Sequence, residues 1–139
     1  MITSKQQKNR VLKQISTFKE RLAAHAKKGV PPHMLKASKA QLRERIAQLQ
    51  AEVAEFDEAC QANISELTFD NLGEMLRLPI KVRLATGQTI PEFARKIQVS
   101  PSTLKRYEAV EYANAPAEVL QTILKTYGLQ VSGHTSHAA

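Results

Sequence analysis

Residues 89–108 read Thr89-Ile-Pro-Glu-Phe-Ala-Arg-Lys-Ile-Gln-Val-Ser-Pro-Ser-Thr-Leu-Lys-Arg-Tyr-Glu108, and they predict two short helices joined by a tight turn. Thr89 and Glu92 have the Thr-x-x-Glu spacing of a capping box, which marks the start of the first helix. Ser100 is suited to cap the second helix, with Pro101 at its first position. Two short helices joined in this way can place the second one in the DNA major groove.

Apolar and polar side chains separate onto opposite faces of these two expected helices. The inward faces carry Phe93, Ala94 and Ile97 on the first helix and Leu104 and Tyr107 on the second. The outward side of the second helix is short, polar and basic, which suits base edges and phosphates. The alternative is an ordinary amphipathic helix pair within a bundle. We expect DNA contacts from Ser100, Ser102, Thr103, Lys105, Arg106, Thr89 and Arg83.

The segment 78–129 resembles the Xre-type (Cro/cI-like phage repressor) helix-turn-helix family. The matching residues are Gly87, Thr89 to Ala94 and Val99 to Glu108, and the likeness continues through 113–128. The resemblance implies a compact five-helix domain that binds double-stranded DNA. It also implies a homodimer on a palindromic operator, acting as a transcriptional repressor or autoregulator.

Two residues depart from the pattern of this family. Ile90 stands where many members carry a Gln that contacts a DNA phosphate, and Pro101 stands where a polar base-reading residue is common. Both changes remove hydrogen-bonding side chains from the expected interface. They shift the expected readout toward the four outward residues from Ser102 to Arg106.

The composition agrees with a polyanionic partner and excludes several other classes. The chain has 139 residues and a formal net charge of +7, which favours nucleic acid as a partner. No apolar run approaches the roughly 20 residues that span a bilayer, and the first residues lack the apolar core of a signal peptide. We therefore expect a cytoplasmic, nucleoid-associated protein that makes no membrane contact.

Catalytic and metal chemistry is not expected from this sequence. The four His residues are not spaced with Cys60 as a zinc site would require. Cys60 lies on an apolar seam, where a buried structural thiol is the expectation. The chain also has no glycine-rich phosphate loop, so we expect no enzyme, no cofactor and no metal.

The charges are strongly segregated along the chain. Residues 1–45 hold twelve Lys and Arg against two Glu, whereas residues 46–74 hold seven acidic residues and no basic one. Such blocks predict electrostatic pairing between segments. Folded antiparallel, the start of the chain would bring Lys8 and its neighbours close to Asp57.

The first sixty residues predict two long helices, from about Ser4 to Ala26 and from about Leu35 to Ala62. They are separated by a breaker that contains Gly29 and Pro31-Pro32. The second helix has a 4-3-4-3-4 apolar spacing that ends at Cys60, which is typical of a heptad seam. We expect an antiparallel helical hairpin with a basic tip. The expected partner or dimer interface is Leu42, Ile46, Leu49, Val53 and Phe56.

The whole chain is therefore predicted to be all-α, with a long N-terminal antiparallel hairpin in front of a five-helix phage-repressor-like domain. The expected divisions are a hairpin over 1–62, a linker over 63–77, the DNA-binding domain over 78–129 and a flexible tail over 130–139. The linker has the pattern of a short strand or an extended tether. Asp70 is expected to cap a short helix after it.

Two functional hypotheses remain open at this point. The first is a dimeric repressor whose hairpin provides dimerisation. The second is an antitoxin of a toxin–antitoxin system, since small basic proteins of this type resemble the HigA-like antitoxins. Such an antitoxin would bind and neutralise a partner toxin through the hairpin or the tail, and it would regulate its own operon.

Overall fold

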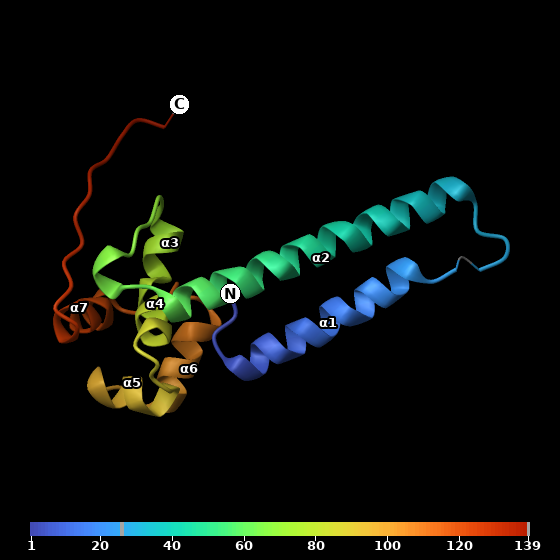
Figure 1. Ribbon diagram of the computed structural model, residues 1–139. Coiled ribbons are helices and arrows are strands. Elements are labelled where there is room, and N and C mark those ends of the chain that lie inside the picture. The colour runs from blue at the N-terminus through green and yellow to red at the C-terminus, as the bar shows by residue number, and fades with distance from the viewer. Residues whose placement is uncertain (26, 139) are drawn as a thin grey trace. The chain divides into compact units, whose positions relative to one another are not determined.

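The computed structural model describes residues 1–25 and 27–138, and every regular element in these ranges is helical (Figure 1). The all-α prediction is thus confirmed for the described residues. The elements are α1 (Lys5–Ala23), α2 (Pro32–Gln61), the 3-10 turn η1 (Ile64–Glu66), α3 (Leu72–Leu76), α4 (Leu78–Ala85), α5 (Ile90–Lys96), α6 (Pro101–Ala109) and α7 (Ala117–Thr126).

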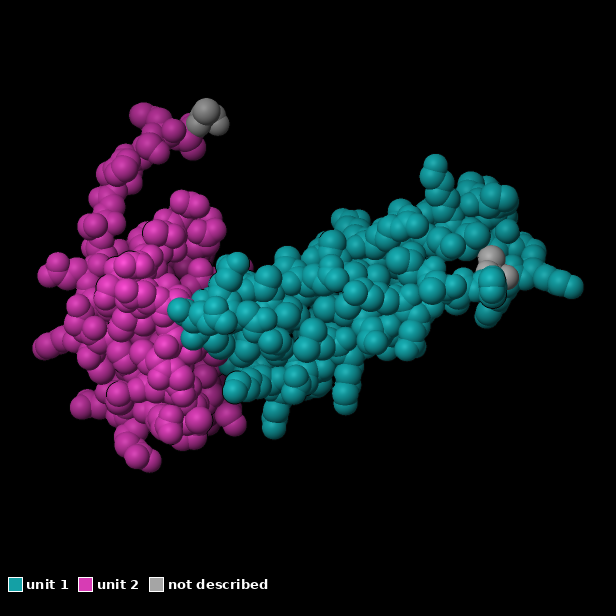
Figure 2. Space-filling view, in the orientation of Figure 1, with its two compact units in different colours: residues 1–61 teal, residues 62–139 magenta. Residues whose placement is uncertain are grey.

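The chain divides into two compact units, residues 1–61 and residues 62–139, which Figure 2 colours teal and magenta. The segment 63–77, expected to be a separate linker, belongs to the second unit. Its apolar side chains line a pocket together with α4 and α7. It is therefore part of the packed structure of that unit.

In the first unit, α1 and α2 run antiparallel and pack along each other (Figure 1). The Ser4 side chain caps α1 by accepting a hydrogen bond from the Gln7 N–H at 3.1 Å. This helix ends at Ala23, before the expected end at Ala26, because Ala24 already has an extended backbone. Ala26 lies outside the described residues. The second helix begins at Pro32, earlier than expected, because proline is well tolerated in a first helical turn.

A small apolar core holds the α1–α2 pair together. Ile15, Ile46 and Leu49 are buried, and Val11, Phe18, Leu22 and Val53 pack against them. This core corrects the expected intermolecular role of the seam Leu42, Ile46, Leu49, Val53 and Phe56, because Ile46, Leu49 and Val53 pack against α1 of the same chain. Pairing two molecules through this seam would first require α1 to separate from α2.

The far end of α2 differs from the heptad expectation at one position. Phe56 and Ala59 are 3% and 4% exposed, whereas the Cys60 side chain lies exposed at the surface. The buried series steps by three residues after Phe56, not by four. The prediction of a buried structural cysteine is therefore wrong.

The predicted charge pairing between the two arms is present at this end. Lys8 Nζ lies 2.6 Å from Asp57 Oδ1, with both side chains partly exposed. A surface pair of this kind contributes only about 0–1 kcal/mol. It therefore helps to set the register of the arms more than their stability.

The residues before α4 form turns and not the strand that their pattern suggested. Asn63 Oδ1 accepts a hydrogen bond from the Ser65 N–H at 3.0 Å and starts the 3-10 turn η1. The next cap is Asn71, not Asp70, because Asn71 Oδ1 accepts from the Glu74 N–H at 2.9 Å. The Asp70 N–H instead donates to Glu74 Oε2 at 2.8 Å. Asn side chains bind nearby backbone N–H groups in this way, which competes with strand formation.

Candidate nucleic-acid interface

Helix α5 begins with the capping box that its sequence predicts. The Thr89 hydroxyl accepts from the Glu92 N–H at 3.4 Å, and the Glu92 carboxylate accepts from the Thr89 N–H at 2.9 Å. Two N–H groups at the helix start are thereby satisfied. Phe93 and Ala94 on the inner face are completely buried. Thr89 therefore caps α5 and is also exposed at the surface of the unit.

The turn between α5 and α6 is a Schellman motif. The Val99 N–H donates to the Ala94 carbonyl at 3.0 Å, and the Gln98 N–H donates to the Arg95 carbonyl at 3.3 Å. Gln98 has a φ of +61°, in the left-handed region that favours glycine. Because these bonds satisfy the last carbonyls of α5, only four residues separate the end of α5 from the start of α6.

We expect Gln98→Gly to raise the free energy of unfolding of this unit by about 0.5–1 kcal/mol. That gain is the difference between roughly 1–2 kcal/mol for a left-handed non-glycine residue and roughly 0.5–1 kcal/mol for the extra entropy of glycine. Urea denaturation followed by tyrosine fluorescence measures it, because Tyr107, Tyr112 and Tyr127 all lie in this unit and the chain has no Trp. The matched variant Gln98→Val should destabilise, because a β-branched residue is strained at positive φ. A loss of stability with glycine would contradict this account.

Ser100 caps helix α6, as predicted, and it is part of a line of hydrogen-bonded polar groups. Its hydroxyl accepts from the Thr103 N–H at 3.2 Å and donates to Thr103 Oγ1 at 2.7 Å. The Arg106 guanidinium in turn donates to Thr103 Oγ1 at 3.4 Å. These residues are spaced three apart, so they follow one another along one side of the helix. The line is a surface of mixed donors and acceptors that ends in a positive charge.

The opposite side of α6 is buried. Leu104 is 0% exposed and Glu108 is 5% exposed, whereas Ser102, Lys105 and Arg106 are exposed and Thr103 is half-buried. The structure thus brings Ser100, Ser102, Thr103, Lys105 and Arg106 together on the outer surface of one helix. The last turn of α5 adds the exposed Arg95 and Lys96, which sequence reasoning did not single out.

Arg83 does not lie on this surface, which corrects its expected role as a phosphate contact. Its guanidinium forms two hydrogen bonds of 2.7 Å with the two carboxylate oxygens of Glu108 and a third of 3.1 Å with the Gln88 carbonyl. Arg83 is only 5% exposed. The paired, buried group joins α4 to the inner face of α6, so it positions that helix and does not face solvent.

A second ion pair fastens the segment that follows α6. Arg77 Nε lies 2.9 Å from Glu111 Oε2, with both side chains about one-third exposed. Glu111 and Tyr112 have φ values of +52° and +60°, two successive left-handed residues without glycine. The ion pair and the buried Tyr112 ring hold this unusual backbone in place.

The Tyr112 hydroxyl is buried beside the Arg83–Glu108 pair. It has no hydrogen-bond partner among the described residues. Burial, and then the negative charge of Glu108, raise the pKa of this phenol above its usual range. The group is therefore neutral at ordinary pH and adds no charge beneath α6.

Sequence reasoning missed Glu108 and Glu111 as structural residues. The signal for Glu108 was present, because it lies four residues after Leu104 and so on the inward face. A carboxylate at such a position needs a cation to compensate its burial. Nothing in the local sequence identifies Arg83, which is 25 residues away, as that cation.

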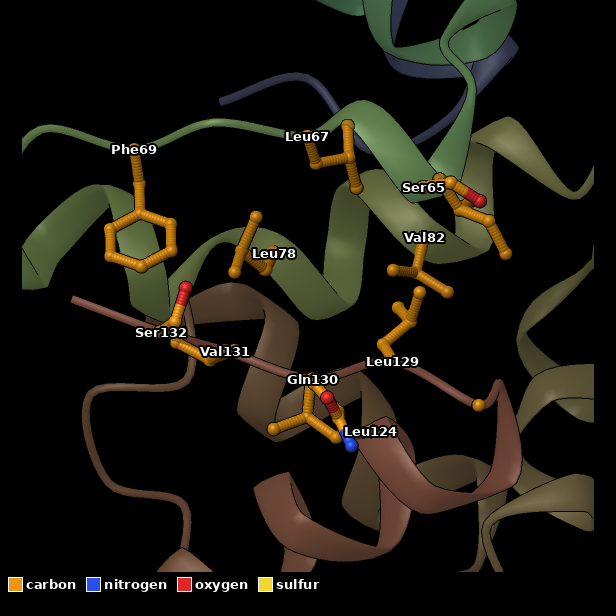
Figure 3. A pocket seen from close by; sticks show the side chains of 12 residues that line it. Ser65, Leu67, Phe69, Leu78, Val82, Leu124, Leu129, Gln130, Val131 and Ser132 are labelled. Carbon is orange, nitrogen blue, oxygen red and sulfur yellow. The ribbon is translucent and has the colours of Figure 1, made fainter.

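A separate pocket of about 300 Å³ lies in the second unit, between the turns before α4, helices α4 and α7, and the chain after α7 (Figure 3). Leu67 and Phe69 line it from one side, and Val82 and Leu124 come from the two helices. Residues 130–132, expected to begin a flexible tail, also line this pocket. Its lining is mainly aliphatic, and it contains none of the residues predicted to contact DNA.

Within the described ranges, no group of three or more His, Cys, Asp or Glu residues is arranged to hold a metal ion. No helix in those ranges combines the length and the apolar character needed to cross a bilayer. Comparison with protein-family models, curated proteins and solved structures found no significant match to this chain.

Proposed function

We propose that this protein binds double-stranded DNA in a sequence-specific manner, with α5 and α6 acting as a helix-turn-helix and α6 as the recognition helix. The observation that carries the proposal is the two-sided character of α6. Its inner side is buried through Leu104 and the Glu108–Arg83 pair, while its outer side presents hydroxyls and cations. A helix whose inner face is fixed by packing and by a buried ion pair can bring short polar groups to base edges in the major groove.

The groups on the outer side divide by chemistry into two roles. Ser102 and Thr103, at the start of α6, are short and can reach base edges, because recognition helices contact bases through their N-terminal residues. Lys105 and Arg106 are long and cationic, and they suit phosphate contacts that fix the register on the duplex. With two copies on a palindromic site, the protein would act as a repressor or autoregulator in the cytoplasm, on nucleoid DNA.

The test is a Lys105→Ala plus Arg106→Ala variant. The probe is a 30-base-pair duplex selected from a random library by the full-length wild-type protein, and binding is followed by fluorescence anisotropy across a salt series. We expect weaker binding and a log–log salt slope shallower by about 1.8 units, because each lost phosphate contact removes about 0.9. The matched control is Lys5→Ala plus Lys13→Ala, which removes the same charge from exposed positions on α1.

An unchanged slope for the α6 variant, or an equal change for the control, would refute the assignment of α6. The same selection tests specificity and stoichiometry. A library that yields no preferred sequence would argue against specific readout. A preferred sequence without two-fold symmetry would argue against a dimer.

A further inference from the structure

The end of the α1–α2 pair at which the arms are connected carries a strong uncompensated charge. We call residues 21–45 the basic tip: it holds seven Lys and Arg side chains against the single acid Glu44, a net charge of +6. At the opposite end of the pair, basic and acidic groups face each other, as in the Lys8–Asp57 contact. The basic tip therefore differs from the opposite end of the pair in having almost no acidic residues to balance its positive charge.

No Lys or Arg of the basic tip has a carboxylate within 4.0 Å among the described residues. The contacts these cations make are of other types: Arg21 lies 5.8 Å from the Phe18 ring centroid, and Arg45 donates to the Gln48 side chain at 3.4 Å. Like charges gathered without counter-charges repel one another and destabilise the compact state. A partner that brings negative charge would relieve this repulsion.

The charges of the tip surround a concave surface between its two arms. A groove of about 540 Å³ lies there, and it belongs entirely to the first unit. Its basic lining residues are Arg21, His25 and Lys27 from the α1 side and Lys39 and Arg45 from α2. No acidic residue is found among the described residues that line it. An anionic chain lying in this groove would meet cations on both sides.

Lys39 of this groove also belongs to a row of cations along α2. Lys36, Lys39 and Arg43 are spaced three and four residues apart, so they share one face of the helix. The row is about 10 Å long at 1.5 Å per residue. A straight row of point charges matches a partner whose negative charges also repeat along a line, as phosphates do along a nucleic-acid strand.

The composition of the tip favours duplex nucleic acid over other polyanions. Residues 21–45 contain no Phe, Tyr or Trp, so they offer no ring on which bases of a single strand could stack. They also lack the aromatic anchors of a helix that binds at a membrane interface. Protein interfaces are depleted in Lys and enriched in aromatic residues, which is the opposite of this surface.

From these observations we infer that the basic tip binds the phosphate backbone of double-stranded DNA as a second contact, in addition to α6. The choice of DNA over duplex RNA rests on the proposed function, because DNA is the duplex that α6 would read. The tip contact carries no base specificity, since it consists of cations and lacks groups aimed at base edges. It would raise affinity for every DNA sequence alike.

The test compares two triple variants of the full-length chain that lose the same charge. Lys36→Gln, Lys39→Gln and Arg43→Gln neutralise the row on the tip. The control variant Lys5→Gln, Arg10→Gln and Lys13→Gln neutralises exposed positions on α1 at the other end of the pair. Binding to a 40-base-pair duplex of random sequence is measured across a salt series. We expect the tip variant to lower the magnitude of the log–log slope by about 2.7 units, or about 0.9 per phosphate contact, and the control to change it by less than one unit.

Several results would overturn the inference. An unchanged slope for the tip variant would do so, and so would equal changes in both variants, because these would reflect net charge alone. The same variants are tested on duplex RNA and on vesicles of phosphatidylserine and phosphatidylcholine. A loss confined to either of those probes would identify a different partner. Circular dichroism melting checks that both variants remain folded.

The α6 variant separates this inference from the proposed function. If the Lys105 and Arg106 substitutions leave binding to the selected sequence unchanged while the tip variant lowers the slope on random DNA, α6 is not the reader but the tip still contacts DNA. If the α6 variant loses binding and the tip variant does not change the slope, the proposed function stands and the inference about the tip is wrong.

Discussion

Replacing Arg83 with methionine is expected to lower the free energy of unfolding of the 62–139 unit by about 3–5 kcal/mol, because it leaves the buried Glu108 carboxylate without its cation. The loss comes mainly from this unpaired charge and not from lost contact area, since methionine retains an apolar chain of similar length. Tyrosine fluorescence during urea denaturation measures the effect, because all three Tyr residues lie in this unit.

The double variant Arg83→Met with Glu108→Leu separates charge from packing. Replacing both members of a buried pair by apolar residues is often neutral or stabilising, so we expect this variant to recover most of the lost stability. A control with Arg77→Met, whose ion pair with Glu111 is about one-third exposed, should lose much less. If the double variant is as unstable as Arg83→Met alone, the pair is not what makes Arg83 important.

Replacing Phe93 with alanine is expected to cost about 3–5 kcal/mol of the same unfolding free energy, the range typical of removing a buried aromatic ring. Phe93 is 0% exposed, and its ring stacks on Tyr127 with a centroid distance of 5.6 Å. The Tyr127 hydroxyl is in turn hydrogen-bonded to the Gln88 side chain. Removing the ring leaves a cavity between α5 and the end of α7.

The matched substitution Phe93→Leu retains most of the apolar volume, and it should cost clearly less than alanine. Both variants are measured by urea denaturation followed by tyrosine fluorescence. Stacking on Tyr127 also makes its emission a direct reporter of the native contact. Equal losses for leucine and alanine would show that the aromatic contact dominates over the cavity. A loss below about 1 kcal/mol for alanine would contradict the packing described here.

The parts of this fold that could be predicted are those determined by neighbouring residues. The capping box of Thr89 and Glu92 and the cap at Ser100 depend on atoms only three residues apart. The stripe of Val11, Ile15, Phe18 and Leu22 follows from helical periodicity alone. Local patterns therefore predicted the helices that carry the candidate interface.

The parts that could not be predicted depend on contacts between distant residues. Arg83 was expected to contact DNA, yet its guanidinium pairs with Glu108, which lies 25 residues away along the chain. The apolar seam of α2 was expected to form an interface with a partner or a second copy of the chain, because the spacing of its residues does not show whether α1 packs against them. Ala59 replaces Cys60 in the buried series because helix packing, and not ideal heptad spacing, selects the last contact.

The seven-residue repeat within the α1–α2 pair allows the pair to be lengthened or shortened by whole heptads without changing its packing. The buried and partly buried apolar residues of α2 recur at an interval of seven, from Ile46 to Val53 and from Leu49 to Phe56. Adding or removing seven residues in both arms would preserve every inward position while changing the length of the pair by about 10 Å. The number of heptads in the α1–α2 pair therefore sets how far the basic tip lies from the other end of the pair.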